Sequence, residues 1–167
     1  MQNYFELFDL EATFAIDDQA LSSAYQTQVS KFHPDKFASK SPSEQLQALQ
    51  NTSLINSAYD ALKSPLERAS YLLTLEGIDP FDHKDTQMDV SFLMAQIELR
   101  EQLDSIKSQQ AELGLDDYIG DIQSHIAENV AAISVSFAGS DGLQKVKNLV
   151  RELKFYSRLN KEANRLM

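Results

Sequence analysis

Hydrophobic residues in the first half of the chain recur every three or four positions, which is typical of amphipathic helices. One predicted helix begins at Asp17, a good N-cap residue, and its apolar face contains Leu21, Tyr25, Val29 and Phe32. A longer helix begins after Ser41, and its predicted buried stripe contains Leu46, Leu49, Ile55, Ala58, Tyr59 and Leu62. We therefore expect these two segments to form a helical hairpin.

Shorter helices are predicted at the base of this hairpin. Asn3 can cap a short apolar helix near the N-terminus. The segments Ser41-Pro42-Ser43-Glu44 and Ser64-Pro65-Leu66-Glu67 both combine a capping box with a proline at the first helical position. The second of them begins a helix that reaches about Glu76, and Gly77 can end it.

The second half of the chain predicts three more helices, over about 89–112, 116–138 and 141–166. The turns between them are marked by Gly114, Gly139 and Gly142. The preceding connection, 77–89, contains Ile78 and Phe81, so we expect it to be packed. The whole pattern predicts an all-α protein, with an N-terminal hairpin followed by a C-terminal three-helix bundle.

The first helix of the predicted bundle has two apolar faces. One face contains Phe92, Leu99, Leu103 and Ile106. The other contains Val90, Leu93, Met94 and Ile97, followed by the acidic residues Glu101 and Asp104. One face can pack into the bundle, while the pattern leaves open whether the other is also core or is an exposed binding surface.

The last helix carries a stripe of basic residues at alternating steps of four and three positions: Lys147, Arg151, Lys154, Arg158, Lys161 and Arg165. Charged runs of this kind are usually exposed to solvent, so we interpret the stripe as a solvated face that pairs with acidic helices.

Composition excludes several classes of function. The net charge of −10 disfavours nucleic acid and anionic membranes as main partners. There is no cysteine, and the three histidines lack the spacing of metal ligands, so we expect no metal site and no cofactor. No apolar run is long enough to span a membrane, and the N-terminus does not resemble a secretory signal. A cytoplasmic protein is the simplest expectation.

The most specific motif is Lys31-Phe32-His33-Pro34-Asp35-Lys36, which lies between the two hairpin helices. Proline cannot continue the first helix, so the helix should end near Phe32 and leave the imidazole and the carboxylate on an exposed turn. A small hydrolase that uses His33 and Asp35 would need a nucleophile and a pocket beside this turn. The sequence shows no nearby nucleophile, so we expect no catalytic residue.

A short helix, a helix that ends in His-Pro-Asp, a long antiparallel helix and a short fourth helix resemble a J-domain. This module stimulates ATP hydrolysis by 70-kDa heat shock chaperones. The resemblance implies that the chaperone is bound by His33, Pro34, Asp35, Lys31 and Lys36. Since Lys31 is the only basic residue of the preceding helix, a dedicated chaperone is favoured over a general one.

The second half is similar to the HscB family of co-chaperones for iron–sulfur cluster assembly. The resemblance rests on Phe92-Leu93-Met94, Glu98-Leu99-Arg100-Glu101 and the segment Val150–Phe155. It implies a J-domain over 1–76, a packed linker over 77–89 and a scaffold-binding bundle over 90–167. The partners would be an IscU-like iron–sulfur scaffold protein and an HscA-like 70-kDa heat shock chaperone. The implied scaffold-binding residues are Leu93, Met94, Ile97, Glu98, Glu101 and Phe155.

By this resemblance the protein is a monomeric co-chaperone and not an enzyme, with the chaperone hydrolysing the ATP. Ser105 stands where the acidic patch of the family continues. Two alternatives remain besides the hydrolase. A J-domain co-chaperone could serve a different client, and a purely structural helical adaptor would affect no ATPase.

Overall fold

The computed structural model describes residues 3–84, 88–109, 114–139 and 142–167, and every regular element in them is an α-helix. The helices are α1 (Tyr4–Leu7), α2 (Asp18–Lys31), α3 (Pro34–Phe37), α4 (Pro42–Leu62), α5 (Pro65–Leu75), α6 (Val90–Ser108), α7 (Leu115–Ala138) and α8 (Leu143–Asn164). The all-α prediction is confirmed. The predicted helix ends at 110–112 and 141 lie outside the described residues. The chain divides into two compact units, Met1–Leu75 and Glu76–Met167.

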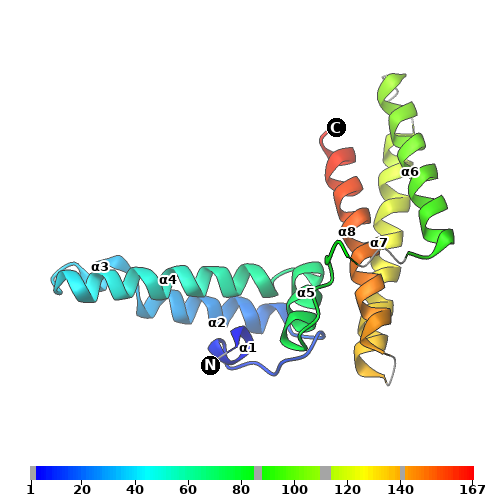
Figure 1. The fold of residues 1–167 in the computed structure, drawn as a ribbon. Helices are drawn as coiled ribbons and strands as arrows, with labels where there is room; N and C mark the ends of the chain where they lie inside the picture. The colour runs from blue at the N-terminus through cyan, green and yellow to red at the C-terminus, as the bar shows by residue number, and fades with distance from the viewer. Residues whose placement is uncertain (1–2, 85–87, 110–113, 140–141) are drawn as a thin grey trace. The chain divides into compact units, whose positions relative to one another are not determined.

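The first unit is a long hairpin of α2 and α4, with α3 at its tip and with α1 and α5 near its base (Figure 1). Its helix starts follow the predicted caps. The Asp17 carboxylate accepts a hydrogen bond from the Gln19 N–H at 2.9 Å. Ser41 and Glu44 form the predicted capping box, and Pro42 is the first residue of α4. Local sequence signals therefore set the ends of both long helices.

The hairpin is held at its base by an apolar core and one buried cation. The fully buried large side chains of this unit are Phe5, Leu21, Ile55, Leu62 and Leu73. The buried Arg68 guanidinium donates to the carbonyls of Phe14 and Leu62 at 2.7 and 2.8 Å. These hydrogen bonds satisfy a charge that would be costly to bury alone, and they tie the loop before α2 to the α4–α5 corner.

Two leucines predicted to be buried in α4 are exposed. Leu46 and Leu49 have 56% and 65% of their surface accessible, whereas Ala48 between them is buried. The stripe that α4 buries passes through Ala48, Ile55 and Leu62, seven residues apart, and is narrower than the predicted one. At the tip of the hairpin, α4 packs only against α3 and the end of α2, so too few neighbours are present to cover a wider stripe.

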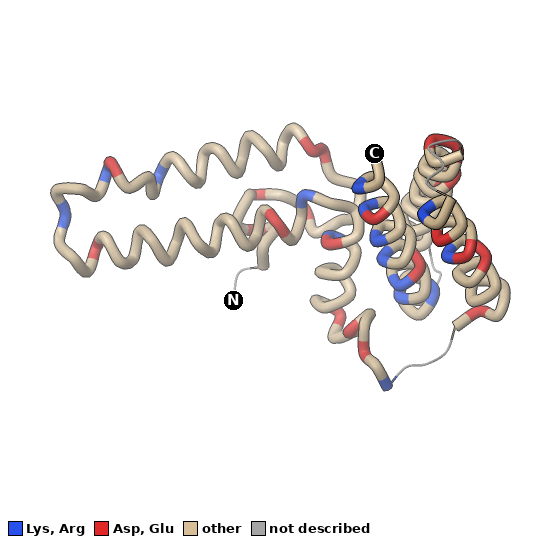
Figure 2. The backbone as a smooth tube through the Cα atoms, turned by 90° about the horizontal axis from the view of Figure 1, so that it is seen from above, with Lys and Arg blue, Asp and Glu red and all other residues tan. Residues whose placement is uncertain are grey.

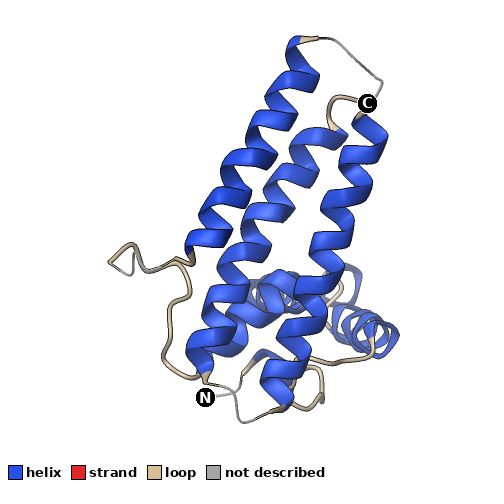
Figure 3. Ribbon diagram, turned by 90° about the vertical axis from the view of Figure 1, so that its right-hand side faces the viewer, coloured by secondary structure: helices blue, strands red, loops and turns tan. Residues whose placement is uncertain are grey.

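The second unit consists of α6, α7 and α8, which run side by side (Figure 3). The predicted inner face of α6 is confirmed, because Phe92, Leu99 and Leu103 are buried. They belong to a core shared with α7 and α8 that also contains Leu115, Tyr118, Ile119, Ile122, Tyr156, Leu159 and Ala163. Gly114 precedes α7 with a φ of 97°, a conformation that favours glycine.

The connection before α6 is described at residues 77–84 and 88–89. Pro80 is buried, and Ile78 and Phe81 are half-buried. The Lys154 ammonium lies 4.0 Å from the centre of the Phe81 ring, a cation–π contact with α8. Gly77, after α5, has a φ of 77°. The predicted limits of the domains and of the linker stay predictions.

The basic stripe of α8 is not solvated along its whole length, which corrects the prediction. Figure 2 shows basic residues gathered along this helix. Lys147 is buried, and Arg151 and Lys154 are half-buried. Only Arg158, Lys161 and Arg165 are exposed. Long basic side chains can cover apolar surface with their aliphatic stems, so a charged position on a helix need not face water completely. No helix in the described ranges is long and apolar enough to cross a membrane.

Candidate functional site

The first candidate site is the His-Pro-Asp turn at the tip of the hairpin. Helix α2 ends at Lys31, as predicted, and His33 is the N-cap of α3. Its Nδ1 accepts a hydrogen bond from the Asp35 N–H at 3.2 Å. Pro34 occupies the first helical position, where its missing N–H costs nothing. The motif therefore builds its own short helix and holds the imidazole in a defined place.

The imidazole and the carboxylate of this turn are open to solvent. His33 Nδ1 lies 3.5 Å from Asp35 Oδ2, and the two side chains are 52% and 92% exposed. Because Nδ1 accepts a backbone hydrogen bond, the neutral ring carries its proton on Nε2 and can present it to a partner. Lys31 and Lys36 flank the turn and are exposed as well. The site is a protruding polar surface and not an enclosed reaction centre.

An apolar cavity of about 310 Å³ lies beside the turn. It is lined by Phe32, Pro34, Phe37, Ala38, Gln45, Ala48, Leu49 and Thr52. Neither His33 nor Asp35 lines it. The only hydroxyl in the lining, that of Thr52, donates to the Ala48 carbonyl at 2.9 Å. A hydrolase would need the His-Asp pair to face a pocket with a nucleophile, so this geometry argues against that alternative.

The second candidate site is the outer face of α6. Val90, Leu93, Met94 and Ile97 are 69%, 40%, 66% and 60% exposed. The pattern left open whether this face is core, and the structure shows that α7 and α8 leave it uncovered. Glu98 and Glu101 are exposed on the same helix. An exposed apolar stripe with carboxylates beside it is typical of a protein-binding surface.

Phe155 lies on α8 and not on α6, yet it reaches the start of α6. Its ring meets the Phe92 ring edge-on, with the centroids 5.7 Å apart. Phe155 is half-buried, and it packs against the core of the unit at the edge of that core. It is thus part core and part surface, and its scaffold-binding role stays a prediction.

Two polar connections hold α6 against the rest of the unit, and the sequence did not predict them. The buried Tyr118 hydroxyl donates to the Leu99 carbonyl at 2.9 Å. Burial raises the pKa of Tyr118 to about 12. The Glu162 carboxylate accepts hydrogen bonds from Lys107 at 2.6 Å and from Arg100 at 2.7 Å. These two cations lower the pKa of Glu162 to about 2.

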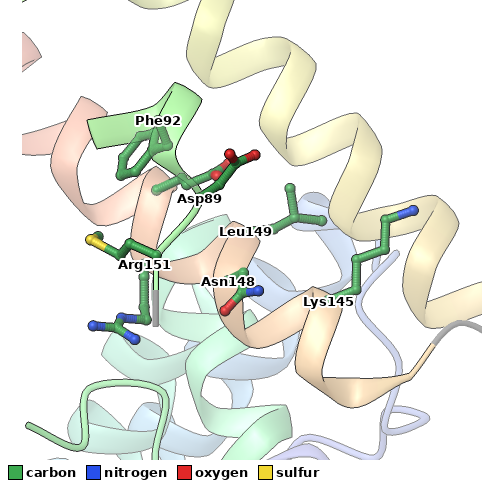
Figure 4. Close-up of a pocket in the computed structure, with 8 residues that line it drawn as sticks. Asp89, Phe92, Lys145, Asn148, Leu149 and Arg151 are labelled. Atoms are coloured by element: carbon green, nitrogen blue, oxygen red, sulfur yellow. The ribbon is translucent and has the colours of Figure 1, made fainter. Parts of the chain in front are cut away.

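A cavity of about 250 Å³, lined by both charged and apolar residues, opens beside the start of α6 (Figure 4). Its lining is Met88, Asp89, Phe92, Lys145, Asn148, Leu149, Arg151 and Glu152. Asp89 caps α6 by accepting from the Ser91 N–H at 3.0 Å. Burial, with a smaller contribution from the Asp89 charge, raises the pKa of Glu152. Throughout the part of the chain that is described, no three His, Asp or Glu side chains gather closely enough to hold a metal ion.

Comparison with known proteins agrees with both units. Residues 3–71 match the DnaJ domain family, and residues 88–164 match the family described as the HSCB C-terminal oligomerisation domain. A J-domain followed by this helical domain defines a J-domain co-chaperone. The chaperone HscB from Vibrio cholerae is 37% identical in sequence, and its solved structure matches with a TM-score of 0.85. The match covers 98% of this chain and 96% of the Vibrio cholerae chain. The chain belongs to the HscB family.

Two further solved structures share the fold. Human co-chaperone protein HscB is 26% identical, with a TM-score of 0.88, and the match covers 98% of this chain and 81% of that chain. The Jac1 co-chaperone from Saccharomyces cerevisiae is 24% identical, with a TM-score of 0.79, and the match covers 99% of this chain and 94% of the Jac1 chain. The predicted family is confirmed.

Proposed function

We propose that this protein binds an IscU-like iron–sulfur scaffold protein and delivers it to an HscA-like 70-kDa heat shock chaperone, whose ATPase it stimulates. The observation that carries the proposal is the exposed apolar face of α6, which occurs in one HscB-family chain together with an exposed His-Pro-Asp turn. The functional parts are a J-domain over 1–76, a linker over 77–89 and a scaffold-binding bundle over 90–167.

The turn engages the chaperone. His33, Pro34 and Asp35 contact its nucleotide-binding part, and Lys31 and Lys36 add positive charge on either side. The turn favours the hydrolysis-competent state of the chaperone by binding that state more tightly. The co-chaperone itself breaks no bond, and the ATP is hydrolysed by the chaperone.

The outer face of α6 binds the scaffold. Leu93, Met94 and Ile97 supply apolar area, and the flexible Met94 side chain can adapt to the partner surface. Glu98 and Glu101 orient the scaffold by pairing with basic side chains. Phe155 completes the surface where α8 meets α6.

Joining both surfaces in one chain couples the two binding events. A scaffold bound to α6 is presented to the chaperone at a high effective concentration. This gain requires no new contact between the scaffold and the chaperone. The protein acts as a monomer in the cytoplasm in this scheme, without a cofactor.

Titration calorimetry with the scaffold protein tests the proposal. Met94→Ala should weaken scaffold binding, whereas His33→Gln should bind the scaffold as the wild type does. Two results together would indicate a J-domain co-chaperone with a different client. Met94→Ala would bind the scaffold as tightly as the wild type does, and the wild-type protein would bind an unrelated unfolded protein.

A further inference from the structure

The tip of the hairpin carries exposed apolar surface that the His-Pro-Asp motif does not explain. Leu46 and Leu49 lie three residues apart on α4, on the same side of that helix, and both are largely exposed. Leu49 also lines the apolar cavity beside the turn. Isolated exposed leucines are ordinary, but Leu49 lines an apolar cavity and Leu46 extends its exposed apolar surface by one helical turn.

The cavity is continuous with the turn. Pro34, the central residue of the motif, is part of its lining, together with Phe32 and Phe37 from either side of the motif. The rings of Phe32 and Phe37 lie parallel, with centroids 6.4 Å apart. The Thr52 hydroxyl of α4, which donates to the Ala48 carbonyl at 2.9 Å, also lies 3.4 Å from the Phe32 carbonyl. A partner that contacts Pro34 therefore also meets the cavity.

Charge on this hairpin is too sparse to give a strong electrostatic fit. Helix α2 contains only Asp18 and Lys31 as charged residues, and α4 contains only Glu44 and Asp60. Figure 2 shows that most of both helices carries no charge. Burial of apolar surface must then supply a larger share of the binding free energy than on a strongly charged surface.

We infer that the cavity lined by Phe32, Pro34, Phe37, Ala48 and Leu49 receives an apolar side chain of the 70-kDa chaperone partner. Leu46 and Leu49 form the rim that excludes water around that side chain. This inference rests on the proposed function and names the apolar determinant that accompanies the polar motif. The cavity volume is at the lower end of the range for ligand pockets, about 300 to 1,000 Å³, which suits a side chain better than a cofactor.

The test compares three glutamine variants in a chaperone ATPase assay over a range of co-chaperone concentrations. The variants are Leu49→Gln, Leu46→Gln with Leu49→Gln, and the control Leu54→Gln. Leu54 is an exposed leucine of the same helix that does not line the cavity. Glutamine keeps the helix propensity of leucine, and far-UV circular dichroism should show unchanged melting for all three.

Leu49→Gln should raise the concentration needed for half-maximal stimulation about tenfold, and the double variant should raise it further. Leu54→Gln should match the wild type. Stimulation by the wild type should change less than about twofold between about 50 and 300 mM KCl, once the intrinsic ATPase rate at each salt concentration is subtracted.

The inference is overturned if Leu49→Gln behaves as Leu54→Gln does while His33→Gln abolishes stimulation. If His33→Gln stimulates as the wild type does, the proposed function itself is wrong. Analytical ultracentrifugation of the wild type and Leu49→Gln tests whether the chain self-associates. A change in self-association with Leu49→Gln and no change in stimulation would mean that a second copy of the chain covers this patch, which also overturns the inference.

Discussion

Arg100 on α6 and Glu162 on α8 form an ion pair in which the guanidinium Nη1 lies 2.7 Å from the carboxylate Oε2. Lys107, two turns further along α6, binds the other oxygen of the same carboxylate. One side chain of α8 thus holds α6 at two points. Since α6 carries the proposed scaffold-binding face, this pairing fixes the part of the bundle on which binding depends.

Replacing Glu162 by glutamine should loosen α6 without unfolding the bundle. Partly exposed ion pairs contribute little, so the expected loss is about 0.5 to 1 kcal/mol in the free energy of unfolding. Hydrogen exchange should show faster exchange of α6 amides than in the wild type, with α7 amides unchanged. Lys161→Gln, at an exposed neighbouring position, is the matched control. Equal exchange in α6 for Glu162→Gln and wild type would show that the ion pairs do not hold the helix.

The same carboxylate predicts a pH dependence. The pKa of Glu162 in the folded protein is about 2, below the unfolded value of about 4.3. Its contribution to stability is therefore complete above the unfolded pKa and is lost as the pH falls toward 2. The difference in unfolding free energy between wild type and Glu162→Gln should shrink between pH 5 and pH 2. Urea titrations at several pH values measure it, and a constant difference would contradict the assignment.

Tyr118→Phe should destabilise the second unit. The hydroxyl donates to the Leu99 carbonyl at 2.9 Å inside the core, and the variant removes this hydrogen bond while keeping the ring. The expected cost is about 0.5 to 1.5 kcal/mol in the free energy of unfolding, measured by urea denaturation. Tyr4→Phe removes a hydroxyl of the other unit that makes no hydrogen bond within the described ranges, and it should have less effect. A Tyr118→Phe protein as stable as the wild type would show that the hydrogen bond contributes nothing net.

Truncating the outer face of α6 should weaken scaffold binding at little cost in stability. Met94→Ala and Ile97→Ala remove side chains that are mostly exposed, so the fold loses little buried area. Each should weaken the affinity for the scaffold about tenfold if it lies near the centre of the interface. Val135→Ala on α7 is the matched control, because Val135 is equally exposed on another helix. Equal affinities for all three variants would place the scaffold elsewhere.

The acidic residues beside that face should control the salt dependence of scaffold binding. Glu98→Gln with Glu101→Gln should reduce the association rate at low salt more than at high salt, because screening already weakens these charges at high ionic strength. Stopped-flow measurements at about 50 and 300 mM KCl provide the comparison. Asp121→Asn, at an exposed position of α7, is the control. An equal slowing at both salt concentrations would mean that the two carboxylates do not steer the scaffold.

Features that depend on a few neighbouring residues could be predicted from the sequence. Asp17 and Ser41 cap their helices as expected, because a cap needs only the residue and the next turn. The inner face of α6 followed from the spacing of Phe92, Leu99 and Leu103. The His-Pro-Asp turn ends α2 where proline requires it.

Features that depend on how many helices surround a position could not be predicted. The exposed Leu49 has the same spacing as a buried leucine, and only the sparse packing at the hairpin tip leaves it open. Lys147 is buried although its position in the basic stripe suggested exposure. The pairing of Glu162 with Arg100 and Lys107 depends on the register between α6 and α8, which no local pattern specifies. Glu162 is one of only two acids in a basic helix, and this was the available signal.

The central claim is that the chain couples a scaffold to a chaperone, and the steady-state ATPase rate of an HscA-like chaperone tests it most directly. The rate is measured with this protein alone, with the IscU-like scaffold alone and with both. We expect the pair to stimulate the ATPase by more than the sum of the separate effects, and either His33→Gln or Met94→Ala to abolish that excess. Stimulation that does not depend on the scaffold, or no stimulation at all, would show that the chain does not couple the two proteins.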